Sequence, residues 1–166
     1  TGVLTDASLA FAVARLAQDE GAEIVLTGAG RGMRLTERTA RKLPREAEVR
    51  EFDVTSAEQA GNLREYLSST WGRVDGALHA IGFAPEICLG EDFMAAKWPD
   101  VAVAMEISAY SLKTVAEVVA PLMTNGGSIV GLDFDARFAW PAYNWMGVAK
   151  APLESTSRYL ARALGP

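Results

Sequence analysis

Apolar residues follow two spacings that alternate from one end of the chain to the other. Stretches with helical spacing, closed by glycine or proline, predict helices over 6–22, 33–43, 56–72 and 100–123, and from Pro141 to Gly165. Short apolar or alternating runs predict strands over 23–28, 47–54, 76–83 and 127–134. Residues 91–100 are irregular, with room for one short helix. In the first predicted helix, Leu9, Val13 and Leu16 supply the apolar periodicity.

Strands that alternate with helices are typical of a parallel sheet covered on both faces. The predicted fold class is therefore α/β, a Rossmann-type doubly wound parallel sheet with helices on both faces. No linker, repeat or low-complexity segment interrupts the pattern, so residues 1–166 are expected to form a single dinucleotide-binding domain. Such a sheet begins with a strand that leads into the first helix. Because this chain begins on the loop that would follow that strand, we expect the first strand to be lacking.

Composition narrows the classes of function. Apolar residues make up 49% of the 166 residues and the formal net charge is −5, a globular balance that argues against nucleic acid as a partner. No apolar run approaches the roughly 18 residues of a membrane span. Cys88 and His79 are the only residues of their types, which excludes an internal disulfide and the usual zinc sites and favours a cytoplasmic protein without a metal.

The first ten residues, TGVLTDASLA, form a glycine-containing loop that enters a helix. The free N–H groups at such a helix start can bind cofactor phosphates. Gly2 allows the backbone to approach, Asp6 or Ser8 can cap the helix, and the Ser8 hydroxyl can donate to a phosphate. A loop followed by a capped helix, without a ligand, explains the same residues.

Three later strand ends carry further candidates, and open α/β sheets bind ligands at such ends. Arg31 and Arg34 follow the first predicted strand, where an arginine favours NADP, but both can equally be solvated surface residues. Asp53 and the Val54 amide follow the second strand and can hold adenine, unless Asp53 serves as a helix cap. Gly82 ends the third strand, where it can admit the nucleotide ribose or simply form a turn.

The stretch YNWMGVAK pairs Tyr143 with Lys150. On a helix, seven residues advance about 700° and about 10.5 Å, so the two side chains share a face. Lys150 can hold ribose hydroxyls, and the Tyr143 hydroxyl can donate to a substrate carbonyl as negative charge develops on it. The bulky neighbours Trp145 and Met146 suit an apolar pocket. The alternative is a buried tyrosine and an exposed lysine without a shared function.

The stretches ISAYS, GGSIVGLDFD and PAYNWMGVAK, together with the Tyr-x6-Lys spacing, resemble the enoyl-acyl carrier protein reductases of bacterial fatty acid synthesis. The resemblance is closest to the mycobacterial and actinobacterial branch of this family, within the short-chain dehydrogenase/reductase superfamily. It covers nearly the whole chain. It implies NADH-dependent reduction of the 2,3 double bond of a trans-2-enoyl thioester, carried on acyl carrier protein or CoA, by a homotetramer.

The resemblance also assigns roles to individual residues. Tyr143 and Lys150 would be the catalytic pair, with Lys150 on the cofactor ribose and Tyr143 on the thioester carbonyl. The remaining cofactor-binding positions would be Gly2, Ser8, Leu9, Asp53, Val54, Ile81 and Gly82. Phe134 and Met146 would contact the substrate beside Tyr143, although Phe134 can also be read as a core residue of its strand.

Two expectations limit this interpretation. NADPH is not excluded as the cofactor, because Arg31 and Arg34 lie where an acidic residue favours NADH. The C-terminal part of such enzymes is expected to be absent along with the first strand. Two other functions therefore stay open: a related reductase of 3-ketoacyl thioesters, and a non-catalytic dinucleotide-binding fragment. The segment GLDFDARF offers no Ser or Thr hydroxyl beside Tyr143, which counts against the ketoreductase.

Overall fold

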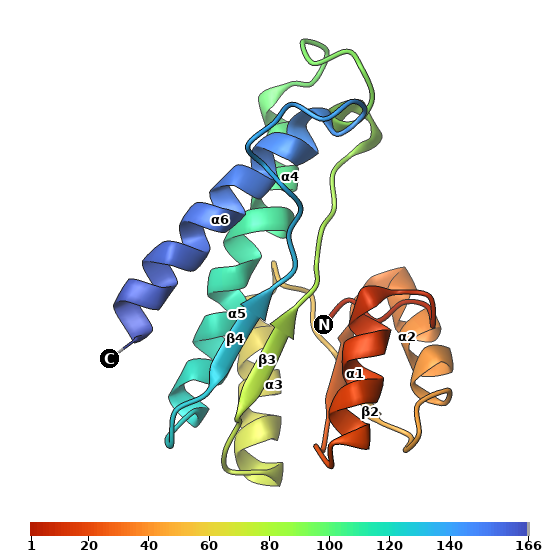
Figure 1. The fold of residues 1–166 in the computed structure, drawn as a ribbon, viewed down its shortest axis with the longest axis vertical. Helices are drawn as coiled ribbons and strands as arrows, with labels where there is room; N and C mark the ends of the chain where they lie inside the picture. Colours follow the sequence, from red (N-terminus) through yellow and green to blue (C-terminus); the bar gives the residue numbers. More distant parts are fainter. Residues whose placement is uncertain (166) are drawn as a thin grey trace. The chain divides into compact units, whose positions relative to one another are not determined.

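The computed structural model describes residues 1–165, and the chain separates into two compact units, Thr1–Gly72 and a second that begins at Arg73. Figure 1 shows helices and strands alternating along both units. The parallel strands joined through helices confirm the predicted Rossmann-like α/β fold class. No helix within residues 1–165 is long and apolar enough to cross a membrane.

The first unit pairs two parallel strands. Its elements are α1 (Leu9–Asp19), β1 (Val25–Gly28), η1 (Gly30–Gly32), α2 (Met33–Ala40), β2 (Glu48–Glu51) and α3 (Ala57–Thr70). Val25 lies opposite Glu48, and α2 packs against both strands. A Cβ at Gly28 would lie 2.9 Å from Thr36 Oγ1, so the glycine lets α2 approach the strand end closely.

Serine side chains cap the first and third helices of the first unit, and Ser8 is one of the two caps proposed from sequence. Ser8 accepts the Phe11 N–H at 3.1 Å, and Ser56 accepts the Gln59 N–H at 3.2 Å. Gly21, just beyond α1, has a φ of +92°, a conformation that favours glycine. Local sequence thus sets where these helices begin and end.

The apolar periodicity of α1 predicts the helix correctly but not the face that it buries. Leu9, Val13 and Leu16 are exposed, with Leu9 at 74%. The buried residues of α1 are instead Ala10, Phe11, Ala14 and Gln18. The large aliphatic side chains of α1 therefore contribute nothing to the core of the described chain.

Gln18 connects α1 to the loop before β2. Its Nε2 donates to Arg45 O at 2.7 Å, and its Oε1 accepts the Arg45 N–H at 3.0 Å. Arg45 in turn donates to Gln18 O at 3.1 Å and to Ala22 O at 2.8 Å. Since Gln18 is only 3% exposed, these bonds satisfy polar groups that would otherwise be buried unpaired.

The second unit contains the second parallel pair. Its elements are β3 (Gly76–His79), η2 (Glu86–Cys88), α4 (Trp98–Met105), η3 (Glu106–Tyr110), α5 (Ser111–Val119), η4 (Ala120–Leu122), β4 (Ser128–Gly131) and α6 (Asn144–Leu164). Gly76 lies opposite Ser128. α5 packs on β3, and α6 packs along α4, η3 and α5 (Figure 1). One cluster of its core joins Ala109, Leu112 and Leu153.

The predicted continuous helix over 100–123 is wrong in detail. Helical structure begins at Trp98, and η3 is a π-helical segment between α4 and α5. The buried Ser108 hydroxyl accepts the Phe83 N–H at 2.9 Å and donates to Phe83 O at 2.7 Å. This side chain ties the widened turn to a loop 25 residues away, which helical periodicity alone does not encode.

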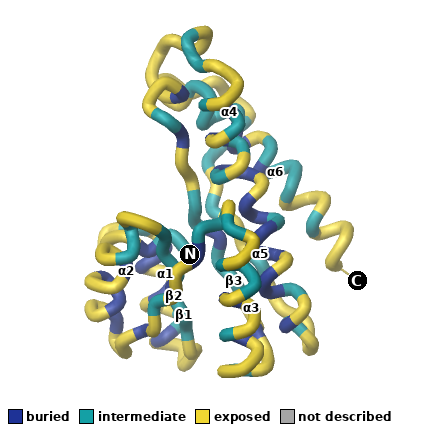
Figure 2. Tube along the Cα trace, turned by 180° about the vertical axis from the view of Figure 1, so that it is seen from behind, coloured by how far each residue is buried: buried dark blue, intermediate teal, exposed yellow. Residues whose placement is uncertain are grey.

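The last helix starts later than predicted. Pro141 lies before it, not in its first turn, because α6 begins at Asn144. The helix continues to Leu164 and accommodates Pro152. Its buried residues are confined to Ala149, Lys150 and Leu153, and Figure 2 shows its C-terminal turns as mostly exposed.

Candidate active site

Lys150 is a buried lysine, only 6% exposed, on the face of α6 that packs into the second unit. Its Nζ donates to Leu132 O at 3.2 Å, just beyond the C-terminal end of β4. Asp133 Oδ1 lies 3.9 Å from the same nitrogen. The alternative of an exposed lysine is therefore wrong.

Burial dominates the electrostatics of this pair. Loss of hydration lowers the pKa of Lys150, and the nearby Asp133 carboxylate only partly opposes this. Burial likewise raises the pKa of Asp133, against the Phe134 N–H that stabilises its charged form. Both shifts run opposite to those of a strong ion pair, so the 3.9 Å contact leaves the ammonium incompletely neutralised.

Two further predicted residues lie beside this ammonium. A Cβ placed on Gly82 would come within 3.8 Å of Lys150 Nζ and 3.9 Å of Met146 Cε. Gly82 therefore lies at contact distance from the lysine, and Ile81 directly precedes it along the chain. The structure thus brings Gly82, Met146 and Lys150 together, as the candidate site requires.

Tyr143 precedes α6 as its N-cap residue and is 44% exposed. Its ring contacts Phe134, with centroids 4.2 Å apart and planes inclined by 33°. The alternative of a buried tyrosine is therefore wrong, and Phe134 lies outside β4, so it is not a strand-core residue. The two aromatic candidates form one half-exposed surface.

The backbone on both sides of Tyr143 is left-handed. Ala142 has a φ of +66° and Asn144 a φ of +47°. Of the residues that the structure describes, no other non-glycine residue has a positive φ. For an L-residue this conformation costs about 1–2 kcal/mol, less for Asn than for Ala. Strain of this kind is concentrated at one candidate catalytic residue.

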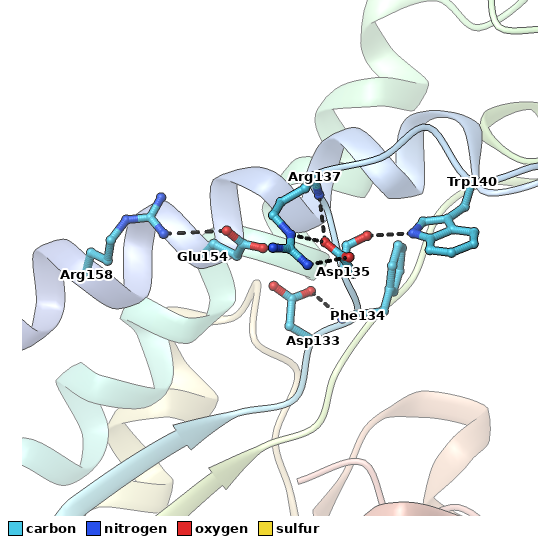
Figure 3. A network of polar contacts seen from close by, with 7 residues as sticks. All are labelled: Asp133, Phe134, Asp135, Arg137, Trp140, Glu154 and Arg158. Atoms are coloured by element: carbon cyan, nitrogen blue, oxygen red, sulfur yellow. Dashed lines mark hydrogen bonds and ion pairs between the residues drawn. The ribbon is translucent and has the colours of Figure 1, made fainter.

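The loop between β4 and α6 is held by its own polar contacts. The Asp135 carboxylate accepts the Arg137 backbone N–H at 3.0 Å and the Arg137 guanidinium at 2.9 and 3.0 Å. The Trp140 indole N–H donates to Asp135 O at 2.8 Å. Figure 3 shows these side chains directed toward Asp135, with Phe134 beside them. The contacts fix the loop that connects Phe134 to Tyr143.

His79 was not among the predicted site residues, yet it lies beneath this region. It is fully buried at the end of β3, and its Nε2 is 2.7 Å from Ser111 Oγ. Since the Ser111 hydroxyl donates its only proton to Ile107 O at 2.6 Å, Nε2 must carry the imidazole proton. Nδ1 is buried and has no hydrogen-bond partner within residues 1–165.

This arrangement keeps His79 neutral. Burial, with a smaller contribution from the Lys150 charge, lowers the His79 pKa to about 4. Its carbonyl accepts the Leu132 N–H at 2.8 Å, and Leu132 O in turn holds Lys150. The histidine therefore supports the strand ends under the lysine. The only sequence feature that could have pointed to His79 is that it is the single histidine of the chain.

The predicted residues of the first unit serve local structure. Gly2 has a φ of +78°, consistent with a tight loop, and Ser8 caps α1 while Leu9 begins it with an exposed side chain. Asp53 Oδ1 accepts the Thr55 N–H at 2.9 Å and the Thr55 hydroxyl at 2.7 Å, which is a turn contact. Val54 follows it within that turn.

The remaining polar candidates agree with this local description. Asp6 pairs with Lys42 at 2.7 Å and does not cap α1. Arg31 and Arg34 are both exposed. Exposure fits both a role in binding NADP and a place on the solvated surface. In the described part of the chain, no cluster of three or more His, Cys, Asp or Glu side chains could hold a metal ion.

Comparison with known proteins supplies the context for this geometry. The chain is 45% identical to the enoyl-acyl-carrier-protein reductase (NADH) of Mycolicibacterium smegmatis, covering 99% of the chain and 62% of that relative. It is 42% identical to the enzyme of the same name from Mycobacterium avium, covering 100% and 63%. The Staphylococcus aureus enoyl-acyl-carrier-protein reductase (NADPH) is 38% identical, covering 99% and 66%.

The chain thus spans between 62% and 66% of the length of these relatives. The sequence model of the family described as enoyl-(acyl carrier protein) reductase matches residues 2–166. That match extends over both compact units and includes the buried lysine, the tyrosine and the strand ends beside them. The chain therefore belongs to the enoyl-(acyl carrier protein) reductase family.

Proposed function

We propose that the whole protein uses NADH to reduce the 2,3 double bond of trans-2-enoyl thioesters carried on acyl carrier protein or CoA. The observation that carries the proposal is Lys150, a buried ammonium held at the carboxyl ends of β3 and β4 next to a glycine. Burying a charge without a close counter-ion is costly, and such groups concentrate at functional sites. Family membership agrees with this assignment.

The residues around Lys150 fit the ribose of a nicotinamide nucleotide. One of the three ammonium N–H groups donates to Leu132 O, which leaves two that can meet vicinal hydroxyls. Gly82 offers a surface without a side chain at that place. Lys150 would thus orient the nucleotide, and its charge would favour negative charge that develops nearby.

NADH, when bound, supplies a hydride to the β-carbon of the enoyl thioester. The electron pair of the double bond then moves toward the thioester oxygen, and the α-carbon takes up a proton to complete the reduction. The Tyr143 hydroxyl would donate a hydrogen bond to that oxygen as it gains charge, which stabilises the transition state more than the ground state. Phe134 and Met146 would exclude water from the reacting bond.

The remaining assignments extend this proposal to the whole protein. Gly2, Ser8 and Leu9 would contact the cofactor's pyrophosphate, Asp53 and Val54 its adenine, and Ile81 and Gly82 its riboses. We also infer that residues 1–166 form part of one dinucleotide-binding domain in a cytoplasmic homotetramer. The buried, unpaired Cys88 agrees with a reducing compartment.

The test is an assay of the full-length protein that follows NADH loss with a 2-enoyl thioester. Tyr143→Phe should lower kcat about 100-fold, because one donor to the developing oxyanion is lost. Lys150→Ala should instead raise the dissociation constant for NADH. Tyr159→Phe and Lys97→Ala change exposed residues of the same types and should leave both constants unchanged.

Two outcomes would redirect the proposal. Full activity of both Tyr143→Phe and Lys150→Ala would remove the assigned roles. Faster turnover with a 3-ketoacyl thioester in the same assay would favour a ketoreductase. Parallel measurements with NADPH decide the cofactor, which matters because a relative named as an NADPH enzyme is 38% identical to the chain.

A further inference from the structure

Tyr143 occupies an unusual backbone setting. It has right-handed dihedral angles, φ −80° and ψ −28°, between the left-handed Ala142 and Asn144. A relaxed chain would turn both neighbours into the right-handed region and continue α6 backwards through Tyr143. Such a change would swing the Tyr143 side chain away from Phe134. Something outside α6 must therefore hold the strained turn.

That support comes from Gly90, more than fifty positions earlier in the chain. The Gly90 N–H donates to Ala142 O at 2.9 Å, and Asn144 Nδ2 donates to Gly90 O at 3.3 Å. Both peptide groups of Gly90 thus bond to the two residues that flank Tyr143. We call this pair of hydrogen bonds the Gly90 clamp.

A second contact joins the same two segments at Trp145, the residue after Asn144. The Trp145 indole N–H donates to Phe93 O at 3.0 Å. The Phe93 and Trp145 rings stack with centroids 4.5 Å apart and planes inclined by 13°. The loop from Gly90 to Phe93 therefore has its position on the start of α6 set at both ends, which gives the clamp a firm base.

The need for glycine at position 90 is conformational. Gly90 has a φ of +83°, and no heavy atom lies within 4 Å of a Cβ placed there. A side chain would find space but would strain the backbone out of the conformation that directs its N–H and C=O at Ala142 and Asn144. Gly126, in the turn before β4, is also left-handed, with a φ of +78°, and also has no heavy atom within 4 Å of a Cβ placed there.

We propose that the Gly90 clamp is a positioning device that holds Tyr143 against Phe134 with its hydroxyl set for the substrate carbonyl. The Asn144 side chain donates one of the two hydrogen bonds of the clamp. Its Oδ1 is buried and has no hydrogen-bond partner in the described chain. This role rests on the proposed function, in which Tyr143 stabilises the transition state more than the ground state. Loosening the clamp should therefore lower kcat and leave NADH binding at Lys150 unchanged.

The experiment compares Gly90→Ala with Gly126→Ala in the full-length protein. Both substitutions put alanine at a left-handed position with open space, so both should reduce stability to a similar degree. Only Gly90→Ala should lower kcat, by about 10- to 100-fold, because a small displacement of a catalytic group has effects of that size. The dissociation constant for NADH should stay at the wild-type value in both variants.

Two further variants keep the test decisive if Gly90→Ala does not fold. Gly90→Asn should fold, since asparagine tolerates a positive φ better than alanine, and its kcat should still lie below that of the wild type. Asn144→Gly keeps the left-handed conformation but removes the side-chain donor, so it should lower kcat several-fold, about 3-fold or more. The expected order of kcat at position 90 is Gly, then Asn, then Ala.

A readout independent of turnover separates this inference from the proposed function. In protein with 13C-labelled tyrosine, the Tyr143 ring signal, assigned by its absence in Tyr143→Phe, should carry the ring-current shift of Phe134. Gly90→Ala should reduce that shift, and Gly126→Ala should not. An unchanged shift in Gly90→Ala, or an equal change in Gly126→Ala, would overturn the clamp. A wild-type protein without reductase activity would refute the proposed function but leave this comparison intact.

Discussion

The two compact units treat their buried polar groups differently. In the first unit, the buried Gln18 side chain exchanges hydrogen bonds with the Arg45 backbone, and the buried Thr39 hydroxyl donates to Leu4 O at 3.0 Å. In the second unit, Lys150 is buried with its carboxylate neighbour 3.9 Å away, and His79 leaves a ring nitrogen unpaired. Thr36 Oγ1 is the exception in the first unit.

Backbone strain follows the same division. Both non-glycine residues with positive φ, among those that the structure describes, lie in the second unit beside Tyr143. Backbone strain of this kind persists where function requires it. At a site with a structural role alone, substitution by a residue that relieves the strain would be favourable. The comparison indicates that the first unit is built mainly from satisfied local contacts, while the second retains destabilising features around the candidate catalytic residues.

The largest expected effect is a loss of folding stability at acid pH, and it comes from His79. Its pKa is about 4 in the folded protein, against about 6.5 when unfolded, so the unfolded state binds the proton more tightly. The stabilisation is therefore fully present above pH 6.5, and is lost as the pH falls from 6.5 to 4. The loss amounts to about 3 kcal/mol over that window.

Urea unfolding of the full-length protein at pH 7 and pH 4.5 measures this loss. His79→Gln removes the titrating group but can still donate to Ser111, so its stability should change less between the two pH values. If wild type and His79→Gln lose the same free energy, other groups control the acid sensitivity, and the contrast between the units weakens.

The next effect concerns the first unit. Gln18→Leu would leave the Arg45 N–H and C=O without their partner, at a loss of about 2 kcal/mol. Its kcat should stay at the wild-type value, because Gln18 serves structure only. Urea unfolding and the reductase assay measure the two quantities, with the exposed Asn62→Ala as a control. A large fall in kcat without loss of stability would contradict the division between the units.

The smallest effect tests Ser8, a residue of the first unit that is proposed to contact the cofactor. Ser8→Ala and Ser56→Ala each remove a helix N-cap, so each should reduce stability by about 1 kcal/mol. Only Ser8→Ala should also weaken NADH binding, since Ser8 is proposed to contact the pyrophosphate. Calorimetric titration of both variants gives the comparison, and equal affinities would leave Ser8 with a capping role alone.

Several features of the fold follow from short stretches of sequence. Alternating periodicities predict the order of helices and parallel strands, and Ser8, Ser56 and Gly21 mark helix ends that the structure confirms. Each depends on a few neighbouring residues, through capping bonds or a glycine conformation. Gly82, at a predicted strand end, and the Tyr143–Lys150 spacing are likewise short-range features, so the sequence alone points to these candidates.

Other features depend on residues far apart in the chain. Ser108 widens the helix by bonding to Phe83, and Gly90 holds the left-handed turn around Tyr143. Periodicity also failed for α1, where Leu9, Val13 and Leu16 are exposed and Gln18 is buried.

The alternating α/β pattern, the helix caps and the residue types that can bind a nucleotide and polarise a carbonyl can be predicted from sequence, because they depend on local spacing and side-chain chemistry. The burial of Lys150, the position of His79 beneath it and the strained turn around Tyr143 become visible only in the folded chain. Burial and long-range hydrogen bonds arise when distant segments pack together, and no single segment encodes them.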